Sequence, residues 1–188
     1  MRLQHLLSLL ASAALFAGCG TDVNLAPASI PNVVDTFTIG SLTSSPVSIP
    51  SAYSVVDGNV VRTDVTSAFD FAYDVDATGQ HVFLTLEVMR LSTTTGSGPG
   101  LQYTSKTFEQ VTQAPSNGWI TSDTIVVDSG SVVLLRSRII CGGLGVPLYG
   151  KLEVLSIDDT PGNQTMTFRA LSNENCGYKS LAPGLPRD

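Results

Sequence analysis

Short runs in which apolar and polar residues alternate, separated by turn-forming residues, limit most strongly how this 188-residue chain can fold. In residues 68–75, for example, Phe71 and Tyr73 fall on one face of an extended strand, while Asp70 and Asp74 fall on the other. A two-residue period is typical of a half-buried strand. No long segment shows the helical period. We therefore predict an all-β chain, a single sandwich or open barrel of about eight or nine mostly antiparallel strands.

Turn-forming residues between the alternating runs predict three hairpins. Asp57 and Gly58 separate two β-branched runs, which predicts a tight turn with positive φ at both residues. Residues 76–79 and 158–163 predict the other two turns. The expected strands are residues 33–39, 53–56, 59–63, 68–75, 80–91, 124–128, 132–141, 148–157 and 164–171. One short helix is expected at residues 107–113, and loops at 41–51 and 92–100, which are rich in Pro, Gly, Ser and Thr.

The N-terminus has the layout of a bacterial lipoprotein signal peptide. Arg2 supplies a positive charge, residues 6–16 are apolar, and small residues precede Cys19. The apolar run is shorter than the roughly 20 residues of a transmembrane helix. An ordinary cleaved secretory signal is the alternative. The pattern predicts a signal peptide at residues 1–18, a lipidated Cys19 with a tether over residues 19–31, and an all-β domain over residues 32–188.

Lipid on Cys19 would place the protein in the bacterial cell envelope, attached to a membrane. Gly20, rather than Asp, follows the cysteine, which favours the outer membrane. The periplasmic and surface faces both remain open. The net charge of −6 and the absence of a Lys/Arg cluster argue against nucleic acid as a partner.

The other two cysteines, Cys141 and Cys176, predict a disulfide, because two cysteines in an oxidising compartment usually pair. A thiolate metal site is the alternative. It lacks a CxxC unit and a nearby histidine.

Catalytic motifs are missing from the sequence. His81 is the single histidine after the signal peptide, which excludes a site that needs two and disfavours a hydrolase, where a base must lie beside a nucleophile. No G-x-S-x-G sequence is present. Acidic pairs at residues 74/76 and 158/159 could bind calcium, but acidic residues are common in turns. We expect neither an enzyme nor a metal site.

Four residues are candidates for binding a ligand. Arg136 and Arg138 lie on one face of an expected strand and could together hold a carboxylate. Alternatively, they lie on an exposed sheet face and pair with Glu153. Trp119 and Tyr149 could line a flat apolar slot, or they could belong to the core.

Five segments, taken in order, resemble the HmuY-like family of lipid-anchored haem-binding proteins. They are the hairpin at residues 53–61 with the strand AFDFAY at 68–73, the Gly/Ser loop at 95–100, FEQVTQAP at 108–115 followed by Gly118-Trp119, VVLLR at 132–136, and YGKLEVLS at 149–156. The resemblance covers about residues 50–170 and implies an all-β protein that hands haem to an outer-membrane receptor.

The chain departs from this family in the residues that would bind the haem iron. The best-known members use two histidines or methionines, and residues 119–148 contain neither. His81 and Met89 would lie about 27 Å apart along one strand, too far to share an iron. Haem would then be held by aromatic and apolar packing or by one axial ligand. We expect a non-enzymatic ligand-binding lipoprotein with haem as ligand, or alternatively a structural or protein-partner-binding lipoprotein without a small-molecule pocket.

Overall fold

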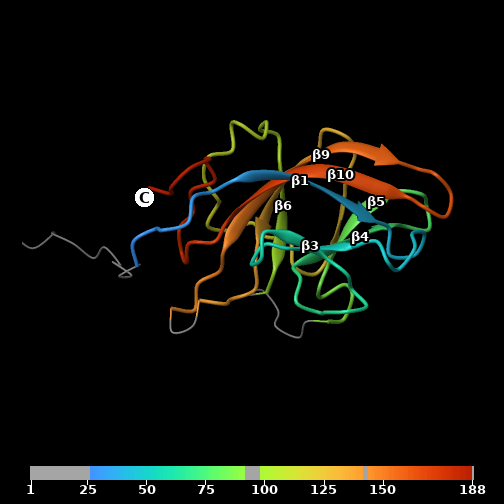
Figure 1. Ribbon diagram of the computed structural model, residues 1–188, viewed down its shortest axis with the longest axis horizontal. Helices are drawn as coiled ribbons and strands as arrows, with labels where there is room; N and C mark the ends of the chain where they lie inside the picture. The colour runs from blue at the N-terminus through green and yellow to red at the C-terminus, as the bar shows by residue number, and fades with distance from the viewer. Residues whose placement is uncertain (1–25, 92–97, 142–143, 188) are drawn as a thin grey trace, which may run out of the picture.

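The computed structural model describes residues 26–91, 98–141 and 144–187, which form two antiparallel five-stranded sheets (Figure 1). The first sheet has the order β1 (Val34–Gly40), β10 (Thr165–Asn173), β9 (Tyr149–Asp158), β8 (Val132–Arg136) and β6 (Gly100–Thr104). The second has the order β3 (Asn59–Val61), β2 (Ala52–Ser54), β4 (Phe71–Val75), β5 (His81–Thr85) and β7 (Thr124–Val126). The predicted all-β sandwich is confirmed. The described residues form no helix and no closed barrel.

Apolar side chains fill three layers, one between the sheets and one on each outer face. The central core includes Tyr53, Phe71, Tyr73, Phe83, Leu135, Leu152, Val154, Met166, Phe168 and Ala170. A second cluster on the outer face of the first sheet includes Phe108, Val111, Leu134, Tyr149, Leu171 and Leu181. A third, on the outer face of the second sheet, includes Ala52, Phe69, Ala72 and Leu86. Because apolar residues of β8 face two layers, its run VVLL is buried throughout.

The three predicted hairpins are present as β2–β3, β4–β5 and β9–β10, but the first turn differs from the prediction. Ser54 pairs with Asn59, so residues 55–58 form the loop, and Gly58 has a positive φ of 56° whereas Asp57 does not. The Ser54 hydroxyl donates to Asp57 Oδ2 at 2.6 Å and accepts from the Asp57 amide at 3.3 Å. These bonds close the longer loop without a second left-handed residue.

Several predicted element boundaries are wrong. The strands expected at residues 80–91 and 132–141 end at Thr85 and Arg136. Strand β6 was not expected. The helix expected at residues 107–113 is a single turn in which the amides of Gln110 and Val111 both donate to the Thr107 carbonyl.

Asp70 does not face solvent as its alternation with Phe71 predicts. It is buried, and its carboxylate accepts from the Val55 amide at 2.7 Å and from the Arg138 amide at 3.1 Å. β4 begins only at Phe71, so Phe69 packs in the outer cluster rather than beside Phe71. Asp70 thus ties the β2–β3 loop to the segment after β8.

The two ends of the described chain are joined at one end of the sandwich (Figure 1). Asn32 and Gly184 exchange two backbone hydrogen bonds, and the Asn175 side chain binds the backbone of Ile30. Leu181 of the C-terminal tail is fully buried. No helix long and apolar enough to cross a bilayer occurs in the described residues.

Cys141 and Cys176 lie at disulfide distance, as the sequence predicts, with Cα atoms 5.9 Å apart. The pair joins the segment that follows β8 to the segment that follows β10. The disulfide therefore anchors residue 141 to the end of the sandwich where the termini meet.

Candidate functional site

Three of the four candidate ligand-binding residues, Trp119, Arg136 and Tyr149, come together at one end of the first sheet. Arg136, the last residue of β8, pairs in register with Tyr149, the first of β9. Trp119 precedes Ile120, whose backbone exchanges two hydrogen bonds with Leu101 of β6. A Cβ on Gly100 would lie 2.9 Å from the Trp119 Cβ, so the close approach of Trp119 to β6 requires glycine.

Two cations flank the aromatic pair formed by Trp119 and Tyr149. The two rings have centroids 5.9 Å apart and planes inclined at 30°. Arg136 Cζ lies 5.5 Å from the Trp119 ring centroid, and Lys179 Nζ lies 6.0 Å from that of Tyr149. Both separations are within cation–π range. We call these four residues the Trp119 surface.

Neighbouring groups hold both cations in place. Arg136 Nε and Nη2 donate to the Gly98 carbonyl at 3.2 and 2.7 Å, and Lys179 Nζ donates to the Ser116 hydroxyl at 2.9 Å. Burial raises the pKa of the Tyr149 phenol, an effect that the charge of Arg136 opposes. Tyr149 therefore stays protonated at neutral pH, and the surface carries positive charge.

Arg138 does not belong to this surface. β8 ends at Arg136, so the expected shared strand face does not extend to Arg138, whose amide donates to Asp70. Glu153, the alternative partner, lies opposite Val132 in the register of β8 and β9, and its carboxylate binds the guanidinium of Arg169 at 2.5 Å.

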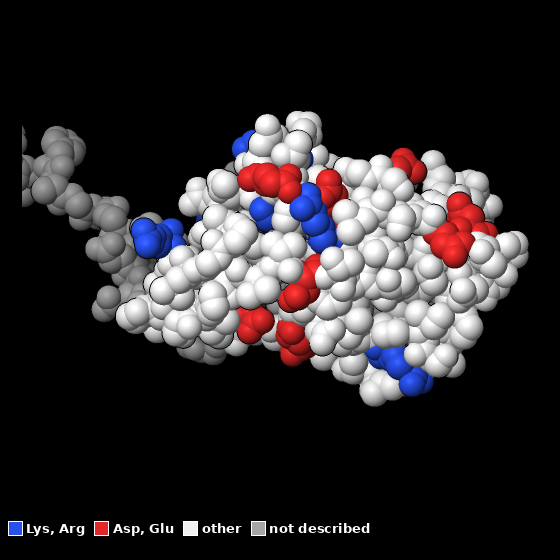
Figure 2. All heavy atoms as spheres, turned by 45° about the horizontal axis from the view of Figure 1, so that its top comes forward, with Lys and Arg blue, Asp and Glu red and all other residues white. Residues whose placement is uncertain are grey.

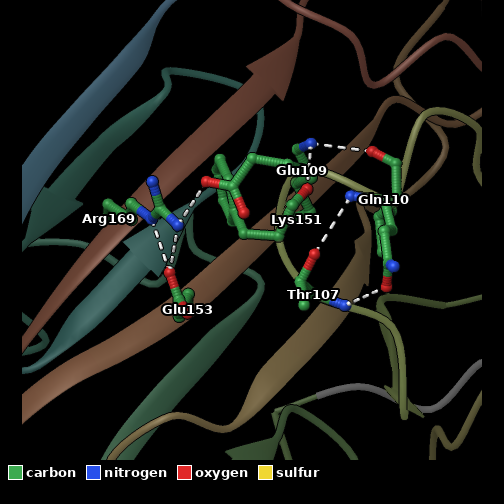
Figure 3. A network of polar contacts seen from close by, with 8 residues as sticks. Thr107, Glu109, Gln110, Lys151, Glu153 and Arg169 are labelled. Carbon is green, nitrogen blue, oxygen red and sulfur yellow. Dashed lines mark hydrogen bonds and ion pairs between the residues drawn. The ribbon is translucent and has the colours of Figure 1, made fainter.

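A buried lysine under the turn at residues 108–111 was missed by the sequence analysis (Figure 3). Lys151 of β9 is 1% exposed, and its Nζ donates to the carbonyls of Phe108 and Val111 at 2.6 and 2.7 Å. The same Nζ lies 4.2 Å from the Phe108 ring centroid. Burial lowers the pKa of Lys151 to about 8. Because the Lys151 amine is buried and binds the carbonyls of both Phe108 and Val111, it holds the turn at residues 108–111 against the sheet.

Replacing Lys151 with methionine is expected to lower the free energy of unfolding by about 1–3 kcal/mol, because two buried carbonyls lose their donor. Methionine keeps most of the side-chain volume. Amide hydrogen exchange should show faster exchange at Val111 and Ala114. The matched control Lys106→Met, at an exposed lysine, should leave both rates unchanged. Equal rates in Lys151→Met and the parent protein would contradict the role assigned to Lys151.

His81 and the acidic pairs lie away from the Trp119 surface and have local partners. His81 Nδ1 contacts the Tyr73 hydroxyl at 2.8 Å, and Nε2 lies 3.2 Å from Asp159. Asp76 and Asp158 accept hydrogen bonds from threonines within their own turns. The described residues contain no group of three or more His, Cys, Asp or Glu side chains that could hold a metal.

Two open grooves of about 310 and 340 Å³ run along Tyr103, Thr104 and Lys106. Trp119, Arg136 and Tyr149 do not line either of them. The grooves and the Trp119 surface are therefore separate features of the first sheet.

Comparisons with protein-family models, curated proteins and solved structures found no match to this chain. The likeness to HmuY-like proteins stays a prediction that rests on the five segments between residues 50 and 170.

Proposed function

We propose that the mature protein is a non-enzymatic, lipid-anchored protein of the bacterial envelope that binds a flat ligand carrying a carboxylate at the Trp119 surface. Haem, with its planar ring and propionates, is the ligand that the sequence resemblance suggests. The observation that carries the proposal is the placing of Arg136 and Lys179 beside the Trp119–Tyr149 pair, in a protein whose net charge is −6.

The chemistry of these side chains matches such a ligand. The partly exposed ring of Trp119 offers an apolar face against which a planar molecule packs, while Tyr149, at 7% exposure, belongs to the buried outer cluster and supports that ring from below. Pairs of aromatic rings contribute about 0.5–1.5 kcal/mol beyond the buried area. Guanidinium and ammonium groups bind carboxylates through charge-assisted hydrogen bonds. A neutral flat molecule would use the rings alone, so the cations favour an anion.

Among the residues that the structure describes, no two histidines or methionines are placed as a pair of axial ligands for haem iron. His81 binds Tyr73 and Asp159, and Met166 is fully buried in the central core. Met89, which β5 does not reach, packs against the outer cluster of the second sheet. Haem would accordingly be held by ring packing and by its propionates.

Haem titration followed at the Soret band tests the proposal. We expect a saturable shift at one equivalent, and Trp119→Leu should weaken binding about ten-fold, since a loss of 1.4 kcal/mol changes affinity ten-fold. Lys179→Gln should weaken it about three-fold, as for a partly exposed ion pair, and the control Lys106→Gln should not. Equal haem affinity in all three variants would place haem elsewhere on the protein. The absence of any saturable Soret shift would rule out haem as the ligand.

Binding of a protein partner at the β6 edge is the second candidate function. Ile120 pairs with Leu101 on the outer edge of β6, and Tyr103 lies further along this edge at 48% exposure, beside the two grooves. An exposed strand edge can accept a strand from another protein. This candidate predicts that a photo-crosslinker at Lys106 captures one envelope protein, and that haem gives no Soret shift.

A further inference from the structure

Exposed apolar side chains gather at the end of the sandwich where the N-terminal segment leaves it. Their exposed fractions are 42% for Ile30, 49% for Ile139, 36% for Ile140, 41% for Leu144 and 54% for Leu185. Single exposed apolar residues are common, but a group of them rimmed by polar residues marks an interaction surface. We call these five residues the apolar end.

Contacts between their neighbours show that the five residues share one region. Asn175 binds the Ile30 backbone, and the next residue, Cys176, is joined to Cys141, which follows Ile140. The Leu144 amide donates to the Cys141 carbonyl at 3.1 Å, and Leu185 follows Gly184, which pairs with Asn32. In Figure 1 the blue start, the red tail and the orange segment near residue 140 lie at the same end.

The proposed lipid anchor lies close to this end along the chain. Cys19 precedes Ala26, the first described residue, by seven positions (26 − 19). Seven extended residues reach at most about 25 Å. Ala26 itself accepts a hydrogen bond from the Tyr178 hydroxyl, so the chain emerges beside residues 175–178. A lipid on Cys19 therefore holds the apolar end within a few nanometres of the bilayer.

The distribution of charge favours the same orientation. Asp76, Asp158 and Asp159 lie at the opposite end, around His81. Figure 2 shows a group of acidic atoms at the right-hand end, with a group of basic atoms at the lower right. The apolar end carries the exposed Arg187, two residues after Leu185, and one exposed acidic residue, Glu174, beside Asn175. Because bilayers with anionic lipids attract basic groups and repel acidic ones, the acidic end is expected to point away from the membrane.

We propose that the apolar end is a membrane-contacting surface that inserts its side chains into the interface of the bilayer to which Cys19 is anchored. This inference rests on the lipidation included in the proposed function. The Cys141–Cys176 disulfide joins the segment that carries Ile140 to the segment that follows β10, so contact at Ile140 orients the whole sandwich. Amphipathic helices that lie in the bilayer interface bury their apolar face about 5–10 Å into the headgroup and acyl boundary, and we expect a similar depth for the apolar end.

Tryptophan quenching by brominated lipids tests the contact. The processed, full-length lipoprotein is reconstituted into vesicles of phosphatidylethanolamine and phosphatidylglycerol with brominated acyl chains, as Leu144→Trp, Leu185→Trp or the control Val47→Trp. Val47 is 67% exposed and lies in the loop after Gly40, at the far end of β1. Because Trp119 is present in every sample, its contribution to the fluorescence is the same in all three variants. The two variants at the apolar end should be quenched about twice as strongly as the control, given this insertion depth.

The mass of the purified chain separates failure of this inference from failure of its premise. An acylated N-terminus together with equal quenching in all three variants would overturn membrane contact and leave lipid anchoring intact. A chain without acyl groups would overturn the anchoring and the contact together. Leu185→Trp is independent of the disulfide-linked segment, so it still decides the question if Leu144→Trp fails to fold.

Discussion

Replacing both Cys141 and Cys176 with alanine is expected to lower the free energy of unfolding by about 3–4 kcal/mol. The disulfide spans a sequence separation of 35 residues. Its loss restores conformational freedom to the unfolded chain. Cys141 is also 5% exposed and packs in the central core. Denaturant unfolding of the double variant, followed by circular dichroism, measures the loss.

Two controls separate the cross-link from the packing of the sulfur atoms. Reduction of the parent protein should cause a similar loss, and the double serine variant should resemble the double alanine variant. Titration of the untreated protein should find no free thiol at either position. Two free thiols, or a loss below about 1 kcal/mol, would contradict the role of the disulfide.

Asp70 is expected to make the free energy of unfolding larger in mild acid than at neutral pH. Burial raises the pKa of Asp70 from its ordinary 3.8 to about 6, although the amides of Val55 and Arg138 oppose this. Between these values the folded state binds more protons than the unfolded state. The contribution of Asp70 is therefore fully present below about pH 4 and is lost as the pH rises through 6, a change of about 3 kcal/mol.

The comparison of Asp70→Asn with the parent protein isolates this effect. Other carboxylates, such as Asp76 and Asp158, have pKa values lowered by hydrogen bonds in their turns and act in the opposite direction. Unfolding free energies measured from pH 4 to pH 7 should fall less steeply in Asp70→Asn than in the parent. Parallel profiles for Asp70→Asn and the parent would contradict the assignment.

The sequence predicts strands well where alternation and turn residues coincide, as in β9 and β10. It misses β6, because this short strand follows Gly98-Pro99 and depends on pairing with β8, some thirty residues later. The strand predicted to begin at residue 80 is too long, because Leu86 and Met89 continue the apolar pattern. In the structure these two residues pack on the outer face of the second sheet. Local periodicity does not reveal these outer layers.

The sequence identified Trp119, Arg136 and Tyr149 as candidate ligand-binding residues, but it did not predict that they lie side by side. Trp119 reaches Arg136 and Tyr149 only because Ile120 pairs with Leu101 and because Gly100 leaves room. Lys151 alternates with Leu152 in the way an exposed residue does. The turn at residues 108–111 covers it in the folded protein, and nothing in the local sequence predicts that cover.

Fluorescence of Trp119 during haem titration tests the central claim most directly, because this is the single tryptophan of the chain. A ligand packed on its ring should quench the emission in a saturable way, with an endpoint at one equivalent that coincides with the Soret shift. Quenching that grows linearly with added haem, or a Soret shift that leaves Trp119 emission unchanged, would contradict binding at this surface.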